Sequence, residues 1–244
     1  MSAPYVELHA RSAFSFLEGA SLPEDLASRA AELGYPALAL LDRNGVYGAP
    51  RFHMAARKAG VRAHVGAEID LEGGARLPLL ARTRAGYQNL CRLITRMKLR
   101  GPKSEECARW DELAEYSEGL IALTGARFTL AGPLARIYGP DNVYVELQRH
   151  CRRDEEARNQ AAAEHARRLK LPLVATNGVA YAAPRERELL DVLTAIRRRL
   201  TLDSAGRLLA HNSERYLKPP EEMARLFSGL PGAAARSAEI SSRL

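Results

Sequence analysis

Long apolar runs and a leader segment are both missing from this chain of 244 residues. The longest apolar run, residues 35–41, is far shorter than the roughly 20 residues that cross a bilayer. The first residues lead into a strand-like segment without the basic and apolar regions of a signal peptide. We therefore expect a protein that neither spans a membrane nor carries a secretion signal.

Cysteines and aromatic residues are also scarce. The three cysteines, Cys91, Cys107 and Cys151, fit neither a disulfide framework nor a zinc ribbon. Aromatic residues make up 6% of the chain, and no stretch interleaves them with basic residues as a base-stacking surface would. These features favour a reducing, cytoplasmic location and argue against a module that binds nucleic acid by stacking.

Basic residues are in moderate excess, with 36 Lys and Arg against 29 Asp and Glu and a net charge of +7. Local concentrations lie at residues 149–153, 167–168 and 197–199. They are typical of solvated helix faces, but contact with a polyanion is an open alternative. Polyanion contact would give binding that weakens steeply with salt.

Apolar strand-like runs alternate with amphipathic segments along most of the chain. The predicted strands are residues 5–9, 37–41, 63–71, 77–82, 120–124, 143–148 and 171–176. The predicted helices are residues 23–33, 50–59, 87–99, 111–116, 154–169 and 185–198. This order predicts an α/β fold with a mainly parallel sheet, best described as a distorted seven-stranded (β/α) barrel. After residue 200 two short helices follow prolines, so we expect a barrel over 1–200 and a helical appendix over 201–244.

In such a barrel, functional side chains come from the carboxyl ends of the strands. The residues found there include an acidic and histidine set that could ligate zinc or manganese: His9, Glu18, Asp42, Glu68 and His150. A single histidine at a strand end is more often a structural group, so only the set as a whole indicates a metal site.

Several ordered motifs resemble one domain family. Residues 7–21, 37–49 and 65–68 are similar to the N-terminal PHP (polymerase and histidinol phosphatase) domain of bacterial C-family DNA polymerases. The opening segments 5–9 and 14–17 are closer to the error-prone type than to the replicative type. The similarity continues through residues 139–142, 145–148, 172–177 and 216–223, so it covers nearly the whole chain. It implies a distorted seven-stranded barrel, in agreement with the strand count.

The resemblance also implies a metal-ligand set, which this chain matches only in part. His9, Glu18 and Glu68 stand at ligand positions of the family. Five other positions depart from the family pattern: Arg11 and Arg43 stand in place of histidines, Ala126 in place of a cysteine, and Gly178 and Ala180 in place of the closing aspartate and histidine.

Arg11 and Arg43 predict that the site no longer binds a metal. A guanidinium cannot donate a lone pair to a metal, and it would pair with Glu18, Asp42 or Glu68 instead. We therefore expect a salt-bridged relic of a metal site without a cofactor. If any ion binds, zinc, manganese or magnesium at His9, Glu18 and Glu68 is the expectation.

Three functions are compatible with these patterns. The resemblance implies the PHP module of an error-prone polymerase, serving replication and translesion repair. It would be a structural and interaction domain without catalytic residues of its own, whose partners are the palm and thumb domains and the DNA held by the polymerase. After the barrel, the chain has no room left for a palm domain. The resemblance implies that the appendix over 201–244 would lead towards the palm domain of the polymerase. A metal-dependent phosphoesterase or 3′–5′ exonuclease is the alternative, and a basic nucleic-acid-binding module is the third.

Overall fold

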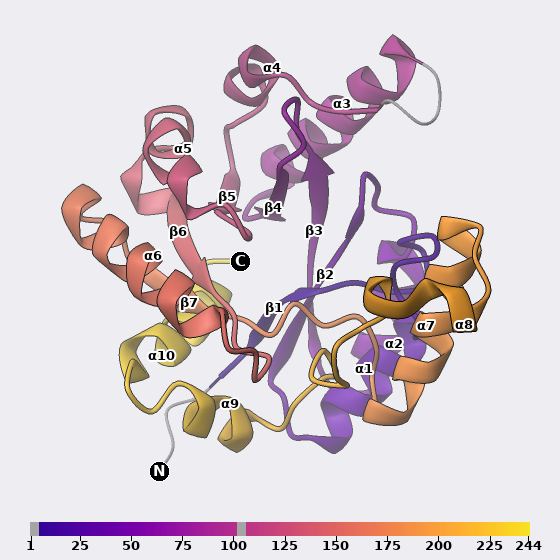
Figure 1. Cartoon of the computed structure of the whole chain (residues 1–244). Helices are drawn as coiled ribbons and strands as arrows, with labels where there is room; N and C mark the ends of the chain where they lie inside the picture. Colours follow the sequence, from indigo (N-terminus) through magenta and orange to yellow (C-terminus); the bar gives the residue numbers. More distant parts are fainter. Residues whose placement is uncertain (1–4, 102–105) are drawn as a thin grey trace.

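A seven-stranded sheet forms the centre of the molecule, and helices surround it (Figure 1). The computed structural model describes residues 5–101 and 106–244, so residues 1–4, on which the signal-peptide expectation partly rests, lie outside it. Every predicted strand is confirmed to within two residues at each end. The strands are β1 (Glu7–Ala10), β2 (Ala37–Arg43), β3 (Arg62–Asp70), β4 (Arg76–Ala81), β5 (Leu120–Leu123), β6 (Val143–Leu147) and β7 (Leu173–Ala175).

The strands follow one another around the sheet in chain order. Pairing is parallel except for β4, which runs antiparallel to both β3 and β5. The reversal follows from the short turn between Asp70 and Arg76, because a parallel connection needs a crossover of a dozen or more residues. Beyond β7, Val179 bridges back to β1: the Val179 amide donates to the carbonyl of His9, and the Arg11 amide donates to the carbonyl of Val179, both at 2.9 Å. The sheet therefore curls on itself, and the α/β barrel prediction is confirmed.

Helices fill the connections and cover the outside of the sheet. The six predicted ones are confirmed, and α5 was not predicted, because its first turn contains Gly132 and Pro133 and lacks a helical start signal. The helices of this part are α1 (Pro23–Glu32), α2 (Ala49–Lys58), α3 (Arg84–Arg100), α4 (Trp110–Glu115), α5 (Ala131–Tyr138), α6 (Glu155–Leu169) and α7 (Arg187–Arg198). Four single 3₁₀ turns accompany them: η1 (Phe128–Leu130), η2 (Pro140–Asn142), η3 (Pro184–Glu186) and η4 (Gly206–Leu208).

The segment after residue 200 contains three further helices, α8 (Leu202–Ala205), α9 (Pro220–Leu226) and α10 (Pro231–Ser242). Helix α10 packs against β7 and β1. Its Ser237 hydroxyl accepts a hydrogen bond of 3.0 Å from the amide of Val6, and Ile240 is buried among strand residues. Among the described residues, no helix has the length and apolarity needed to cross a membrane.

A buried histidine connects β3 to α10. His64 Nε2 lies 2.8 Å from the Ser241 hydroxyl, and burial, together with nearby Arg62, lowers the pKa of His64 to about 4. An unfolded histidine titrates near a pKa of about 6.5, so the neutral ring stabilises the fold above that pH. This stabilisation is lost as the pH falls through 4.

We therefore predict that acid weakens the wild-type protein through His64. The shift corresponds to about 3 kcal/mol, most of which disappears between about pH 6.5 and 4. Urea unfolding of the wild type and of His64→Asn at several pH values measures the effect. The variant should lose less stability over this interval, and parallel curves would contradict the assignment.

Candidate functional site

The mouth of the barrel contains a buried histidine between two carboxylates. His9, on β1, places Nδ1 2.7 Å from Glu146 Oε1 and Nε2 3.2 Å from Glu68 Oε1. All three side chains are almost fully buried. Each ring nitrogen therefore faces an acceptor, an arrangement that suits the doubly protonated imidazolium.

The electrostatics of His9 follow from this geometry. Burial acts to lower the pKa of His9, but Glu146 and Glu68 outweigh it and raise the pKa to about 9. Burial likewise acts to raise the pKa of Glu146, and His9 reverses that effect and keeps the pKa low. At neutral pH the group is a charged ion triad, and a protonated imidazole cannot ligate a metal.

Glu18, in the loop after β1, is surrounded by four arginines. Its Oε1 accepts from Arg43 at 2.6 Å and from Arg197, and its Oε2 accepts from Arg76 at 2.6 Å and from Arg11 at 3.5 Å. The carboxylate is almost fully buried, whereas Arg43, Arg76 and Arg197 are about one-third exposed. The four cations come from the β1 loop, the end of β2, the start of β4 and the last turn of α7.

These arginines set the charge state of the acidic groups. Burial acts to raise the pKa of Glu18, but Arg76, Arg11 and Arg43 overcome it and lower the pKa to about 2. Glu68 accepts from Arg11 Nη2 at 3.2 Å, and Arg11 and His9 hold its pKa well below the usual range despite burial. Both carboxylates are therefore ionised at any physiological pH.

A third acidic residue extends the network outward. Asp70, at the end of β3, accepts from Arg43 Nη2 at 2.6 Å and lies 3.2 Å from Arg76 Nε. Arg43 and Arg76 thus each connect Asp70 to Glu18. The network joins β2, β3, β4 and the β1 loop through direct contacts between guanidinium and carboxylate groups.

Asp42, another member of the predicted set, belongs to a separate hydrogen-bond group. Its Oδ1 accepts from the Ser12 amide at 2.8 Å and from the Ser15 hydroxyl at 2.8 Å, and both its oxygens accept from the Ser12 hydroxyl at 2.9 Å. Burial raises its pKa, against these hydrogen bonds. Asp42 therefore fixes the β1 loop, and the arginines pair with Glu18, Glu68 and Asp70.

The remaining predicted positions line the opening around this network. His150 lies at the rim, where Nδ1 is 3.0 Å from Glu155 and Nε2 is 2.8 Å from the carbonyl oxygen of Asn177. Ala126 and Ala180 line the walls of the clefts described below. Gly178 has a positive φ of 55°, and its carbonyl accepts from Arg215 Nε at 2.9 Å.

Four important residues were missing from the predicted set: Arg76, Glu146, Arg197 and Arg215. Arg76 starts β4, so a search of strand carboxyl ends misses it; because β4 is antiparallel, its beginning lies at the barrel mouth. Glu146 lies within β6 and would be found only by its acidic charge inside a buried strand. Arg197 belongs to the basic cluster over 197–199, which alone could not reveal a buried partner at Glu18.

The donor set does not fit a divalent metal ion as it is arranged. Both nitrogens of His9 face carboxylates, and both oxygens of Glu18 accept from guanidinium groups. Glu68 Oε1 is shared by His9 and Arg11. Within residues 5–101 and 106–244, no three His, Cys, Asp or Glu side chains are grouped to hold a metal.

Two adjoining clefts open over the network, with volumes of about 500 and 390 Å³. They share the residues Arg11, Arg76, His150, Arg152 and Arg215. The first cleft extends to α7 and η4, and the second extends to the loop after β5 and to α6. The barrel mouth is therefore accessible from outside.

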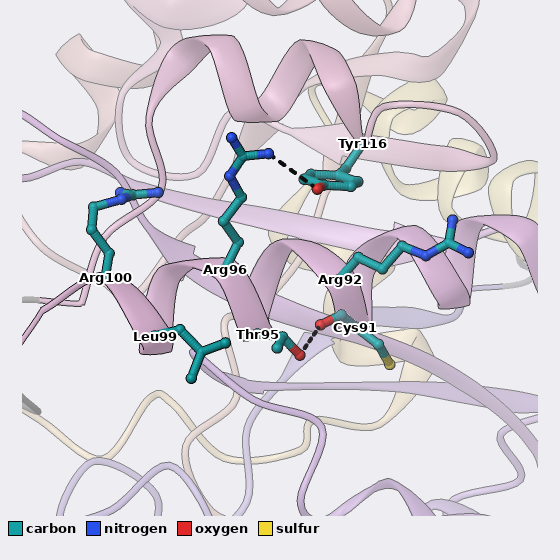
Figure 2. A pocket seen from close by; sticks show the side chains of 7 residues that line it. All are labelled: Cys91, Arg92, Thr95, Arg96, Leu99, Arg100 and Tyr116. Atoms are coloured by element: carbon teal, nitrogen blue, oxygen red, sulfur yellow. Dashed lines mark hydrogen bonds between the residues drawn. The ribbon is translucent and has the colours of Figure 1, made fainter.

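A third hollow, of about 620 Å³, lies on the outer side of α3 (Figure 2). Figure 2 shows Arg96 extending from α3 to the hydroxyl of Tyr116, at 3.2 Å. Arg96 and Arg100 also pair with Glu112. The hollow contains none of the predicted site residues, so the barrel mouth is the candidate site.

Comparisons with known proteins agree with the sequence resemblance. The model of the PHP domain family matches residues 7–138. An error-prone DNA polymerase of Anaeromyxobacter sp. (strain K) is 43% identical over 251 residues, and error-prone DNA polymerase 1 of Agrobacterium fabrum (strain C58) is 39% identical over 249 residues. These alignments cover 97% and 100% of this chain but only 22% and 23% of the two relatives.

The fold has a solved counterpart. An amidohydrolase from Chromobacterium violaceum, whose structure has bound sulfate and no metal, superposes with a TM-score of 0.51 at 14% identity. The superposition covers 72% of this chain and 87% of the amidohydrolase. Since the family model matches more than half of the residues, this chain belongs to the PHP domain family.

Proposed function

We propose that this chain is the N-terminal PHP module of an error-prone DNA polymerase and that it acts as a metal-free structural and interaction domain. The single observation that carries the proposal is Glu18, a residue at a family ligand position whose charge is balanced by four arginines. Guanidinium groups there take over the neutralising role that cations have in a metal site. The identity to error-prone polymerases over nearly the whole chain supports the assignment to that class.

In this proposal the polymerase carries out replication and translesion repair in the cytoplasm, and the palm and thumb supply its catalytic activity. The barrel over residues 1–200 packs beside them, and residues 201–244 lead towards the palm. The arginine network stabilises the barrel because Glu18 joins the β1 loop to β2, β4 and α7, and Asp70 adds β3. A rigid barrel is what a supporting domain requires.

We predict that divalent metals do not stabilise the protein. Zinc, manganese and magnesium should each leave the melting temperature unchanged, as should EDTA, because a ligand bound only to the folded state would raise it. Protein purified without a histidine tag should contain far less than one equivalent of any of these metals by mass spectrometry. Stoichiometric metal that disappears in Glu68→Ala would contradict the metal-free assignment.

Activity assays separate this proposal from the alternative hydrolase. A phosphoesterase or exonuclease of this kind needs metal ions to activate water. We expect no release of phosphate from nitrophenyl phosphate, and no release of nucleotides from single-stranded DNA, above a His9→Ala control. The supporting role is tested by adding the chain to a palm and thumb polypeptide of the same polymerase: primer extension should increase, and an unchanged rate would contradict it.

A further inference from the structure

The two clefts at the barrel mouth contain a large excess of positive charge. Their lining includes three glutamates, Glu18, Glu68 and Glu155, and nine arginines: Arg11, Arg76, Arg127, Arg152, Arg158, Arg197, Arg198, Arg207 and Arg215. The glutamates balance only part of this charge. Like charges gathered in a concave site raise the local concentration of the opposite ion.

Six of these arginines do not pair with Glu18, and one of the six, Arg152, pairs with Asp154 at 3.2 Å instead. Among the described residues, none of the other five has a carboxylate oxygen within the 4 Å of an ion pair. They come from five different segments, namely the loop after β5, α6, the end of α7, η4 and the segment after η4: Arg127, Arg158, Arg198, Arg207 and Arg215. Arg11, Arg76 and Arg197, in contrast, already pair with Glu18.

Arg215 is the central residue of this group, because it lines both clefts. Its Nε donates to the carbonyl of Gly178 at 2.9 Å, which fixes the guanidinium. Its two terminal nitrogens have no acceptor among the described residues. Burial and the neighbouring Arg11 lower the pKa of Arg215 to about 10, because Glu68 and Glu146 compensate its charge only in part. An anion in the cleft would relieve this cost.

The chemistry of the lining indicates which anion fits. No Phe, Tyr or Trp lines either cleft, whereas nine arginines do, so the lining favours the phosphate over the base as the recognised group. Guanidinium forks bind phosphate oxygens in pairs. A phosphate chain also concentrates more charge and more acceptor oxygens than carboxylate side chains do.

We propose that the two clefts form one metal-independent binding site for consecutive phosphate groups, held by Arg127, Arg158, Arg198, Arg207 and Arg215. The ligand is either a short free polyphosphate or the phosphodiester backbone of a single strand, which share this chemistry. The site goes beyond the supporting role proposed above, because it does not depend on attachment to a polymerase and uses arginines outside the Glu18 network.

Two probes distinguish the sources. Tripolyphosphate binding is measured by calorimetry, and binding of a fluorescent oligothymidylate is measured by anisotropy, both in EDTA and low salt. The cleft variant combines three substitutions at exposed positions, Arg158→Gln, Arg198→Gln and Arg207→Gln. The control variant combines Arg57→Gln, Arg84→Gln and Arg136→Gln, which removes the same amount of charge at exposed positions outside the clefts.

The wild type should bind at least one of the two probes. The cleft variant should weaken that binding by about tenfold or more, and the control variant should stay within about twofold. For the oligothymidylate, the slope of log affinity against log salt should also become shallower by about 2 in the cleft variant.

Whichever probe shows this difference identifies the source. The proposal is overturned if neither probe binds, or if the control loses as much affinity as the cleft variant. It is equally overturned if oligoglutamate competes as well as tripolyphosphate at equal charge, since the site would then select acidic peptides. A metal-free structural module remains possible in each of these cases, so the two proposals fail separately.

Discussion

Replacing Glu18 with glutamine should destabilise the barrel by about 3 kcal/mol, because removing one partner of a buried ion pair leaves charges without compensation. In Glu18→Gln, four guanidinium groups would lie around a neutral amide. Three of them are about one-third exposed, and water would screen part of their repulsion. For a protein of this size the expected loss is about 6 to 12 °C in melting temperature.

The matched control is Glu24→Gln. Glu24 pairs with Arg51, but both side chains are more than one-third exposed, so this pair contributes at most about 1 kcal/mol. Thermal unfolding of both variants should separate a large effect from a small one. If Glu18→Gln melts within a degree or two of Glu24→Gln, Glu18 does not stabilise the barrel by compensating the charge of the arginines.

A second substitution tests the electrostatic cause. Adding Arg197→Gln to Glu18→Gln removes one of the excess cations and should restore part of the lost stability. In the wild-type background, Arg197→Gln alone should destabilise, because Glu18 loses a partner. Opposite signs in the two backgrounds measure the coupling directly, whereas equal effects would mean that the residues act independently.

The strands could be predicted from the sequence because buried parallel strands read as nearly continuous apolar runs. The segment over 37–43 is an example, with all but its last residue buried. The direction of β4 could be inferred only from the shortness of the turn before it. Helix α5 was missed because its composition lacks the start signals on which such a prediction depends.

The candidate site was predictable only where local position decides it. His9 and Arg43 lie in the last residues of β1 and β2, and Arg11 follows β1, so their closeness could be inferred from the barrel alone. The contact of Glu18 with Arg197 joins residues 179 positions apart, and no local pattern encodes it. One residue of the basic run over 197–199, Arg197, pairs with Glu18 in the site, and the composition of the run could not reveal this contact.

His9 should give the second large effect, with a characteristic dependence on pH. In the wild type, the raised pKa of about 9 means that the imidazolium stabilises the fold fully below about pH 6.5, and this stabilisation is lost as the pH rises through 9. In His9→Gln, Glu146 stays buried without its cation, so burial raises its pKa. The variant therefore loses stability as the pH rises above about 4.3.

The difference in unfolding free energy between wild type and His9→Gln should thus pass through a maximum near pH 6.5, where it reaches about 3 to 5 kcal/mol. It should narrow towards acid, where Glu146 of the variant is protonated, and towards alkali, where His9 of the wild type loses its proton. Urea unfolding from pH 5 to 9 measures this curve. The control is His53→Gln, because His53 is exposed. A difference that is constant over this range would mean that His9 stabilises the barrel by packing and not as the cation between Glu68 and Glu146.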